Sequence, residues 1–178
     1  MKELESERLI LRSWTLEDLD DFYEYAKNDN VGPNAGWKPH ESKEESEKIL
    51  KSFIKNNEVW AIEYKENKKV IGSIGLHKDE MRSGINGKML GYVLSEDYWG
   101  RGIMPEAVKE TIKYAFEEEA LDLIAVHHFR FNDRSKRVIE KSGFKYEGIL
   151  RRGRKLFNGR VVDLVLYSML KEEYSEMK

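Results

Sequence analysis

Two glycines flank a basic residue at the start of an amphipathic helix, in the tripeptide Gly100-Arg101-Gly102. The apolar run at 89–94 predicts a strand, and apolar residues that recur every three to four positions over 103–116 predict a helix with one buried face. The first N–H groups of a helix have no intrahelical partner, and the helix dipole adds positive potential there. The segment therefore predicts a strand–turn–helix unit whose turn binds an anion, most often phosphate. The other interpretation is a tight connection that binds nothing, because glycines also serve that purpose.

The composition limits the class of protein. A length of 178 residues favours one domain over 1–178, with a core over about 5–170. The formal net charge of -2 argues against a nucleic-acid partner. The chain has no cysteine, which excludes disulfides, thiolate catalysis and cysteine–zinc sites. No apolar signal region or run of membrane-spanning length is present, so we expect a cytoplasmic protein without a membrane partner. We also expect no bound metal.

Hydrophobic periodicity predicts the remaining elements. Strands are predicted at 8–12, 59–64, 70–76, 89–94, 123–129, 144–150 and 161–170, and helices at 15–26, 42–54, 103–116 and 132–142. Capping boxes are predicted at Thr15 with Asp18 and at Ser42 with Glu45, and Asn132 is predicted to cap its helix. The predicted buried faces of the first two helices are Leu16, Leu19, Phe22, Tyr23 and Ala26, and Ile49, Leu50, Phe53 and Ile54. Residues 28–40 read as a long loop, and the charged residues 171–178 as a peripheral segment.

Several segments together resemble one enzyme family. These are residues 5–12, Trp99–Ala107, Asn132–Ser135 and Glu140–Phe144. Over about residues 5–170 the chain resembles the GNAT superfamily of acetyl-CoA-dependent N-acetyltransferases, and within it the RimJ/RimL type that acetylates the N-termini of ribosomal proteins. The resemblance implies an α/β (α+β) fold, with a mixed, mostly antiparallel sheet of about seven strands and about four helices. It also implies a V-shaped splay between the fourth and fifth strands, at 89–94 and 123–129, where the cofactor lies.

The resemblance also implies the cofactor contacts. The family's phosphate loop, Gln/Arg-x-x-Gly-x-Gly/Ala, aligns with residues 99–104, where Trp99 replaces the polar first residue and Met104 the small last one. Backbone amides carry most of the pyrophosphate binding in such a loop, and Arg101 adds a cation. The implied contacts of acetyl-CoA are Tyr92, Val93, Leu94, Trp99, Gly100, Arg101, Gly102, Ile103, Met104, Asn132 and Ser135.

The implied chemistry is direct attack of an amine on the thioester, without an acyl-enzyme intermediate. A backbone N–H near Val93 or Leu94 polarises the thioester carbonyl, and Ser135 is the candidate general acid for the leaving thiolate. The glutamate that serves as base in some relatives aligns with Arg154, so the family's base cannot be transferred to this chain. The candidate bases that remain are His77, Glu80, His127 and His128, each of which could instead be a packed or solvated residue.

The acceptor is less constrained. Trp37 and His40 could line an acceptor site, or the tryptophan could anchor its long loop. The basic cluster Arg151, Arg152 and Arg154 could attract an acidic peptide or a cofactor phosphate, or be solvated. We predict transfer to a protein N-terminal α-amine. The alternatives are a small-molecule amine (polyamine, aminoglycoside or amino acid) and a non-catalytic CoA-binding regulatory module. The resembling branch also makes a homodimer possible.

Overall fold

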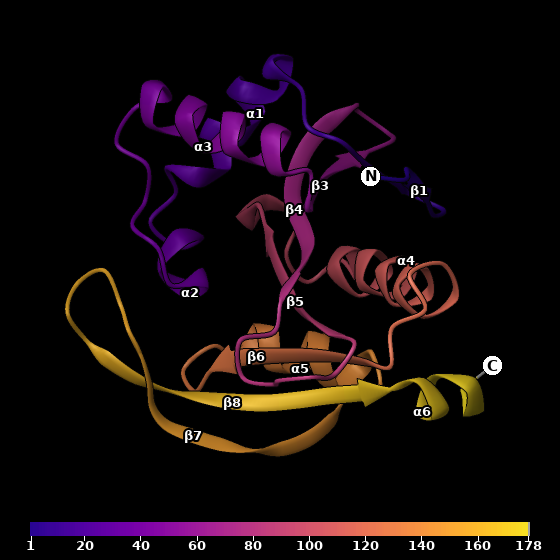
Figure 1. Cartoon of the computed structure of the whole chain (residues 1–178). Helices are drawn as coiled ribbons and strands as arrows, with labels where there is room; N and C mark the ends of the chain where they lie inside the picture. The colour runs from indigo at the N-terminus through magenta and orange to yellow at the C-terminus, as the bar shows by residue number, and fades with distance from the viewer. Residues whose placement is uncertain (178) are drawn as a thin grey trace. The chain divides into compact units, whose positions relative to one another are not determined.

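The computed structural model describes residues 1–177, so the end of the predicted C-terminal segment at Lys178 lies outside the described residues. The strands are β1 (Leu4–Glu5), β2 (Leu9–Arg12), β3 (Val59–Tyr64), β4 (Lys69–Lys78), β5 (Gly87–Leu94), β6 (Leu123–Phe129), β7 (Lys145–Lys155) and β8 (Val161–Leu170). The helices are α1 (Leu19–Ala26), α2 (Gly32–Ala35), α3 (Lys43–Asn56), α4 (Ile103–Glu117), α5 (Asp133–Lys141) and α6 (Lys171–Glu176), with 3-10 turns η1 (Leu16–Asp18) and η2 (Glu96–Tyr98) (Figure 1).

The described strands hydrogen-bond in the order β1-β2-β3-β4-β5-β6-β8-β7, which forms one mixed sheet. The chain divides into two compact units, which we describe separately. The first unit contains residues 1–75 and 92–107, and the second contains residues 76–91 and those from 108 onward. Strands β4 and β5 and helix α4 each run from one unit into the other.

In the first unit, antiparallel pairing joins β1 to β2, β2 to β3 and β3 to β4. Helices α1 and α3 lie side by side in this unit (Figure 1). A core cluster beneath them contains Trp14, Phe22, Tyr25 and Leu50 with other buried apolar side chains. Burial of these large side chains is the main stabilising term for such a layer.

The helix starts agree with the predicted capping patterns, with one change of partner in each box. The Asp18 carboxylate accepts from the Thr15 N–H at 2.8 Å, but the Asp18 N–H donates to the Thr15 carbonyl oxygen, at 3.2 Å, instead of to its hydroxyl. The Ser42 hydroxyl accepts from the Glu45 N–H at 3.2 Å, but the Glu45 carboxylate accepts from the backbone N–H of Glu41 instead of that of Ser42. The local capping signals were therefore correct about where the chain turns into a helix.

Three of the predicted core positions in the first two helices are wrong. Leu16 is 54 % exposed and Ile54 is 39 % exposed. Tyr25, not Tyr23, is buried in α1. The residues before Leu19 form a 3-10 turn, with three residues per turn, so Leu16 does not fall on the apolar stripe of the α-helix that follows.

Strand β4 approaches the end of β5 closely at one glycine. A Cβ built on Gly72 would lie 2.4 Å from the carbonyl oxygen of Val93, a separation that no side chain permits. The Ser95 N–H donates to the Ile71 carbonyl oxygen at 2.7 Å in the same region. Gly72 is therefore required by packing against the strand that leads into the glycine turn.

In the second unit, β5 and β6 pair in parallel only from Gly87↔Leu123 to Leu90↔Val126, although both strands continue. Beyond that point, β6 remains paired with β8 through Phe129↔Leu164. Strand β7 pairs antiparallel with β8 at the other side (Figure 1). Among residues 1–177, the parallel ladder therefore ends before either strand does, as the resemblance implies for these two strands.

The element counts differ from prediction. Residues 1–177 contain eight strands and six α-helices, compared with about seven and about four predicted. The additions are β1, which is only two residues long, α2 within the predicted loop 28–40, and α6 in the predicted peripheral segment. Elements this short carry too little periodicity to be detected. Pro33 in the first turn of α2 and Gly36 after it are local signals that could have indicated that helix. Among residues 1–177, no helix is both long and apolar enough to cross a membrane.

Candidate functional site

The glycine turn lies after β5 and before α4, as predicted, and the 3-10 turn η2 between β5 and the glycines was not predicted. Gly100 and Gly102 both have a φ of +73°, a left-handed conformation that glycine adopts without steric cost. The first α-helical bond after the turn runs from the Glu106 N–H to the Gly102 carbonyl oxygen at 3.3 Å. The N–H groups of Ile103 and Met104 precede that bond, so they lie outside the helical ladder at the positive end of the helix dipole.

The turn is open on its outer side. A Cβ at Gly100 would meet no atom within 4 Å, and one at Gly102 would meet only the Arg8 side chain, at 3.6 Å. Ile103 and Met104, in contrast, are 1 % and 4 % exposed. The Met104 side chain, which replaces the small residue of the family pattern, therefore packs inward. The backbone of the turn stays exposed and fits a phosphate group.

Trp99 closes the turn against the strand. Its indole N–H donates to the carbonyl oxygen of Leu94, the last residue of β5, at 2.9 Å. The ring packs against the core cluster of the first unit. The tryptophan that replaces the family's polar residue therefore fixes the distance between the end of the strand and the turn.

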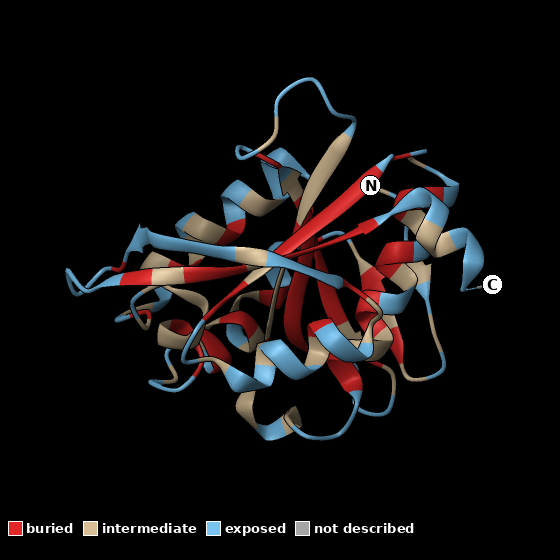
Figure 2. Cartoon of the chain, turned by 90° about the horizontal axis from the view of Figure 1, so that it is seen from below, coloured by how far each residue is buried: buried red, intermediate tan, exposed pale blue. Residues whose placement is uncertain are grey.

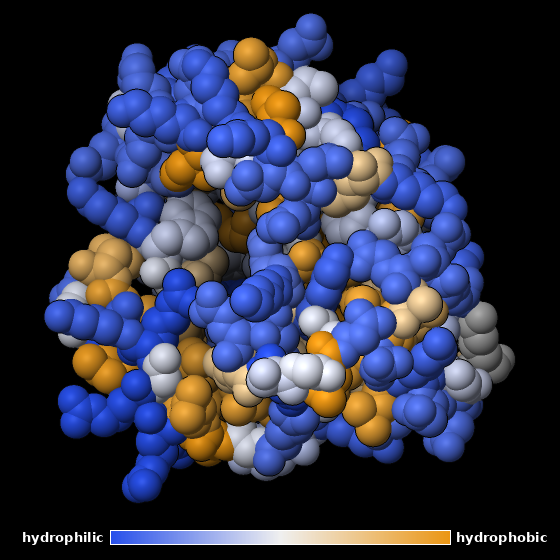
Figure 3. Space-filling model, in the orientation of Figure 1, coloured by the Kyte–Doolittle hydropathy of each residue, from blue (hydrophilic) through white to orange (hydrophobic). Residues whose placement is uncertain are grey.

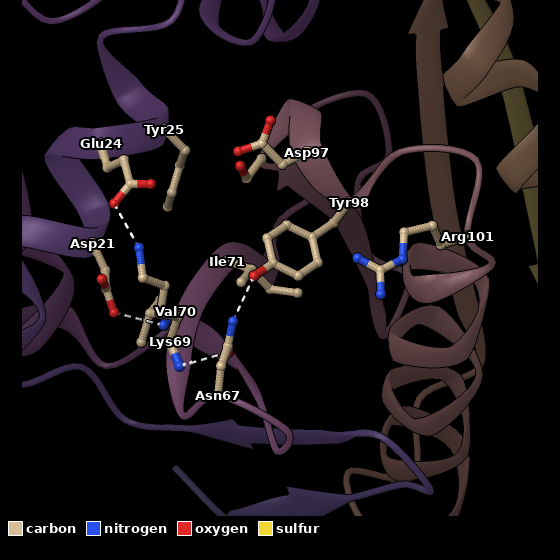
Figure 4. A pocket seen from close by; sticks show the side chains of 11 residues that line it. Asp21, Glu24, Tyr25, Asn67, Lys69, Val70, Ile71, Asp97, Tyr98 and Arg101 are labelled. Carbon is tan, nitrogen blue, oxygen red and sulfur yellow. Dashed lines mark hydrogen bonds and ion pairs between the residues drawn. The ribbon is translucent and has the colours of Figure 1, made fainter.

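The Arg101 side chain lies over two aromatic rings. Its guanidinium carbon is 5.5 Å from the centre of the Tyr64 ring and 5.2 Å from that of Tyr98, and Nη2 lies 3.3 Å from the Tyr64 hydroxyl. Figure 4 shows the guanidinium directed toward Tyr98. Cation–π contacts thus hold this charge beside the turn.

Arg101 and Tyr98 also line a pocket of about 230 Å³ in the first unit. Several of its polar groups are already engaged with one another (Figure 4). Asp21 accepts from the backbone N–H of Val70 at 2.8 Å, Glu24 pairs with Lys69 at 2.9 Å, and the Asn67 amide donates to the Tyr98 hydroxyl at 2.8 Å. The hydrogen-bonded side chains that line the pocket therefore support the residues that lead into the turn.

Ser6 and Arg8, in the N-terminal segment, form hydrogen bonds to the turn and to α4 that the sequence did not predict. The Glu106 carboxylate accepts from the Ser6 hydroxyl at 2.7 Å and from the backbone N–H of Arg8 at 2.8 Å. The Arg8 side chain donates to Glu106 from Nε at 2.7 Å and to the Arg101 carbonyl oxygen from Nη1 at 3.0 Å. Burial acts to raise the pKa of Glu106, but the hydrogen bonds from Ser6 and Arg8 and the charge of Arg8 hold it below its usual value. No local pattern connects partners separated by 98 residues.

In the second unit, the start of α5 is built as predicted. The Asn132 side chain accepts from the Ser135 N–H at 3.1 Å, and the Asn132 N–H donates to the Phe129 carbonyl oxygen at 2.7 Å. Asn132 and Ser135 are both half-buried. The cap therefore ties the first turn of α5 to the end of β6 and fixes where the Ser135 side chain begins.

Two of the candidate bases lie on β6 and differ in environment. His128 is 5 % exposed, and its Nδ1 lies 2.9 Å from the Phe129 carbonyl oxygen. His127 is half-buried, and within the described part of the chain its buried Nδ1 has no hydrogen-bond partner. Burial lowers the pKa of His127, Arg154 and His128 lower it further, and Asp79 acts in the opposite direction. The lowered pKa keeps the half-buried His127 ring neutral near pH 7, whereas the whole His128 side chain lies in the interior.

The other two candidate bases lie at the end of β4 and just after it. The half-buried His77 ring would be 3.3 Å from a Cβ at Gly91, so it packs over that glycine, and Glu80 is exposed. Between them, the sequence reading missed the buried Asp79, which pairs with Arg82 at 2.8 Å. Among the described residues, no group of three or more His, Asp or Glu side chains could hold a metal ion.

The two residues predicted to line an acceptor site have structural contacts in the first unit. His40 is 7 % exposed, and its Nδ1 lies 2.7 Å from the hydroxyl of buried Ser46. Burial lowers the pKa of His40, with Glu45 acting in the opposite direction. Trp37 packs on the core cluster, with its ring centre 5.1 Å from that of His40. These contacts favour the alternative in which the tryptophan anchors the segment.

Comparisons with known proteins identify the family and agree with the fold. The family model described as an acetyltransferase (GNAT) domain matches residues 8–145. The chain is 31 % identical over 173 residues to the uncharacterized N-acetyltransferase YoaA of Bacillus subtilis, covering 94 % of this chain and 96 % of the relative. A GNAT-family acetyltransferase structure from Bacillus anthracis has a TM-score of 0.87 at 24 % identity, covering 97 % of this chain and 100 % of that one. The ribosomal-protein-S5-alanine acetyltransferase from Vibrio fischeri has a TM-score of 0.78 at 24 % identity, covering 98 % and 99 %. The chain belongs to the GNAT family of N-acetyltransferases.

Proposed function

We propose that this enzyme transfers the acetyl group of acetyl-CoA directly to the α-amine of a protein N-terminus. The observation that carries the cofactor site is the open turn at Gly100 and Gly102, whose exposed backbone leads into the N-terminus of α4. Acetyl-CoA supplies the thioester carbonyl that the amine attacks, and the backbone N–H groups of the turn bind its pyrophosphate. A match to the family model that spans both compact units supports the proposal that residues 1–178 act as one domain.

The remaining roles follow from the chemistry of acyl transfer. A C–N bond forms as the C–S bond breaks, so the carbonyl oxygen needs a donor and the leaving sulfur a proton. A backbone N–H of Val93 or Leu94 polarises the carbonyl, and the Ser135 hydroxyl supplies the proton. A thiol pKa near 8.5 makes this proton helpful but not obligatory.

The proposed base is His127. Its buried Nδ1 has no hydrogen-bond partner among residues 1–177, and its lowered pKa keeps the half-buried ring neutral near pH 7. An α-amine, with a pKa of about 7.7–8.0, needs only modest help to lose its proton, whereas a lysine amine, at about 10.4, needs much more. Because Arg154 occupies the position of the glutamate base of some relatives, an α-amine is the acceptor that this site suits best.

The protein acceptor also draws support from the fold. A ribosomal-protein-S5-alanine acetyltransferase has the same architecture over nearly the whole chain. The absence of cysteine fits a cytoplasmic enzyme, and a cytoplasmic location is part of the same proposal.

The decisive experiment is a CoA-release assay with short unblocked peptides and small amines in parallel, and with products identified by mass. The proposal expects N-terminal acetylation of peptides and no release with the same peptides blocked at the N-terminus. Release with small amines alone would refute the protein acceptor. CoA binding without product across the panel would indicate a non-catalytic binding module.

A matched pair of glycine variants tests the cofactor site. Gly102→Glu places a side chain and a negative charge at the turn, whereas Gly84→Glu introduces the same change at another open glycine of nearly equal φ, +74°. We expect Gly102→Glu to weaken acetyl-CoA binding at least about 10-fold, which is about 1.4 kcal/mol, and Gly84→Glu to leave it unchanged. Equal affinities in the two variants would place the cofactor elsewhere.

A serine variant tests the proposed acid. Ser135→Ala should reduce kcat more than it weakens acetyl-CoA binding, because the hydroxyl acts on the leaving group. Ser175→Ala, at an exposed serine of α6, is the control. An unaltered kcat in Ser135→Ala would remove that hydroxyl from the chemistry.

A further inference from the structure

The hairpin of β7 and β8 in the second unit is held by a small buried cluster that includes the last residue of β6. Leu156 is 6 % exposed and belongs to a buried cluster with Phe129, Val162 and Leu164. The tip is closed by a bond from the Leu156 N–H to the Arg160 carbonyl oxygen at 2.8 Å. The hairpin is therefore an ordered element that presents its outer side chains in a defined arrangement.

The hairpin is strongly basic in an acidic chain. Residues 148–163 contain five basic side chains and one acidic side chain, a net +4, so the rest of the chain carries -6 to give the total of -2. All five are exposed, and none has an ion pair among the contacts of residues 1–177. They are Arg151, Arg152, Arg154, Lys155 and Arg160. The single carboxylate, Asp163, is engaged by the backbone N–H of Arg152 at 2.8 Å and lies 4.0 Å from Arg130.

Large apolar side chains are exposed beside these charges. Phe157 is 48 % exposed, Val161 42 % and Phe131 39 %, and the Arg160 guanidinium lies 5.1 Å from the centre of the Phe131 ring. Figure 2 shows β7 exposed along most of its length, and Figure 3 shows hydrophobic and strongly hydrophilic side chains intermingled at the lower left, over the hairpin. Such a mixture of aromatic, aliphatic and arginine side chains is typical of protein-binding surfaces.

We propose that this hairpin surface, formed by the five basic side chains with Phe131, Phe157 and Val161, binds an acidic segment of the protein whose N-terminus is acetylated. Charge complementarity identifies the occupant as acidic, since a second copy bound through the same surface would oppose +4 with +4. The exposed apolar side chains favour a polypeptide over a polyphosphate backbone, and the net -6 of the remaining chain opposes a nucleic acid.

The surface is connected to the proposed chemistry within the same unit. Arg154 belongs to it, and the charge of Arg154 acts on the His127 ring. An acidic segment bound here would therefore occupy the unit that contains the proposed base. This inference rests on the proposed function for the identity of the acceptor, but binding of an acidic peptide can be measured without acetyl transfer.

The test is peptide binding by fluorescence anisotropy with the full chain. Short peptides share their first residues and differ only in carrying Glu, Gln or Lys further along. The expected order of affinity is Glu, then Gln, then Lys, and the difference should vanish in about 1 M salt, where the Debye length is about 3 Å. Equal affinities for the three peptides at low salt would overturn the proposal, as would tighter binding of a single-stranded RNA of equal charge.

Charge reversal supplies the matched control. Arg151→Glu with Lys155→Glu should weaken binding of the Glu peptide about 10-fold or more and strengthen binding of the Lys peptide. Lys109→Glu with Lys113→Glu, at exposed positions of α4, makes the same change of net charge and should alter neither. Gln replacements at Arg151 and Lys155 serve if the reversed variant unfolds.

The failures are distinguishable. Weaker acetyl-CoA binding in the hairpin variant would assign these cations to the cofactor and overturn the docking proposal. Tight, charge-dependent binding of the Glu peptide without acetylation of any peptide would refute the proposed function while the docking surface stands.

Discussion

Arg8→Gln tests whether the N-terminal segment holds the cofactor turn in its binding conformation. The substitution removes the ion pair of Arg8 with Glu106, at 2.6 Å from Nη2 and 2.7 Å from Nε. It also removes the bond from Nη1 to the Arg101 carbonyl oxygen at 3.0 Å. The backbone N–H of residue 8 and the Ser6 hydroxyl continue to satisfy the carboxylate. The perturbation is therefore confined to one side chain and its two partners.

The magnitude follows from exposure. Hydrogen bonds to charged groups contribute about 1.5–3 kcal/mol, and fully exposed ion pairs about 0.2–1 kcal/mol. The Arg8 side chain is 36 % exposed and that of Glu106 16 %, which places the pair between these limits. We expect a loss of about 1–2 kcal/mol of unfolding free energy, or about 3–6 °C in Tm for a chain of this size. Loss of the bond to the turn should weaken acetyl-CoA binding about 3- to 10-fold, with kcat nearly unchanged.

Arg12→Gln is the control for a purely structural effect. Arg12 ends β2, the strand that begins directly after Arg8, and it pairs with Asp18 at 2.8 Å and Glu63 at 2.6 Å, but no described contact joins it to the turn. Thermal unfolding and calorimetric titration with acetyl-CoA should show both variants destabilised, and only Arg8→Gln weakened in affinity. Equal loss of affinity in the two variants, or none in either, would refute a role for Arg8 in holding the turn.

Three further outcomes are expected. Gly72→Ala should destabilise the fold by about 1–3 kcal/mol in chemical denaturation, because its Cβ would meet the Val93 carbonyl oxygen at 2.4 Å; a neutral result would disprove that close approach. The pKa of His127 in the folded protein lies below 6.5, so the stability that the neutral ring contributes is present above that pH and is lost as pH falls through the lowered pKa. His127→Gln should therefore flatten the decline in Tm between about pH 7 and pH 5. Parallel declines in the variant and the wild type would contradict this. Ser46→Ala should cost about 1–3 kcal/mol in thermal unfolding by leaving buried His40 Nδ1 unpaired, and an unchanged Tm would show that this hydrogen bond adds nothing.

Local sequence signals predicted the long elements well. The structure reproduces the strands at 59–64, 123–129 and 161–170 at their predicted bounds, and Asn132 caps α5 as predicted. Apolar periodicity and capping side chains act over a few residues, so their signal is complete within each segment. The short elements β1, α2 and α6 were missed because one or two turns of helix, or a two-residue strand, carry no period.

In the candidate site, too, the features that depend on adjacent residues were predicted, and those that depend on burial were not. The glycine turn, its helix and the Asn132 cap were predicted from adjacent residues, and the structure has them in the predicted conformations. The sequence left His127 and His128 equal as candidate bases, and only burial separates them.

By itself, the sequence determined the order of the elements, the glycine turn at a helix N-terminus and the family, because each is indicated by short motifs of neighbouring residues. Only the tertiary structure decided that Arg8 and Glu106 hold the turn, that Met104 packs in the interior and that the five hairpin cations are exposed without an ion pair among residues 1–177. Those features depend on contacts and burial between residues far apart in the chain. Chain folding alone brings such residues together, and no local pattern encodes it.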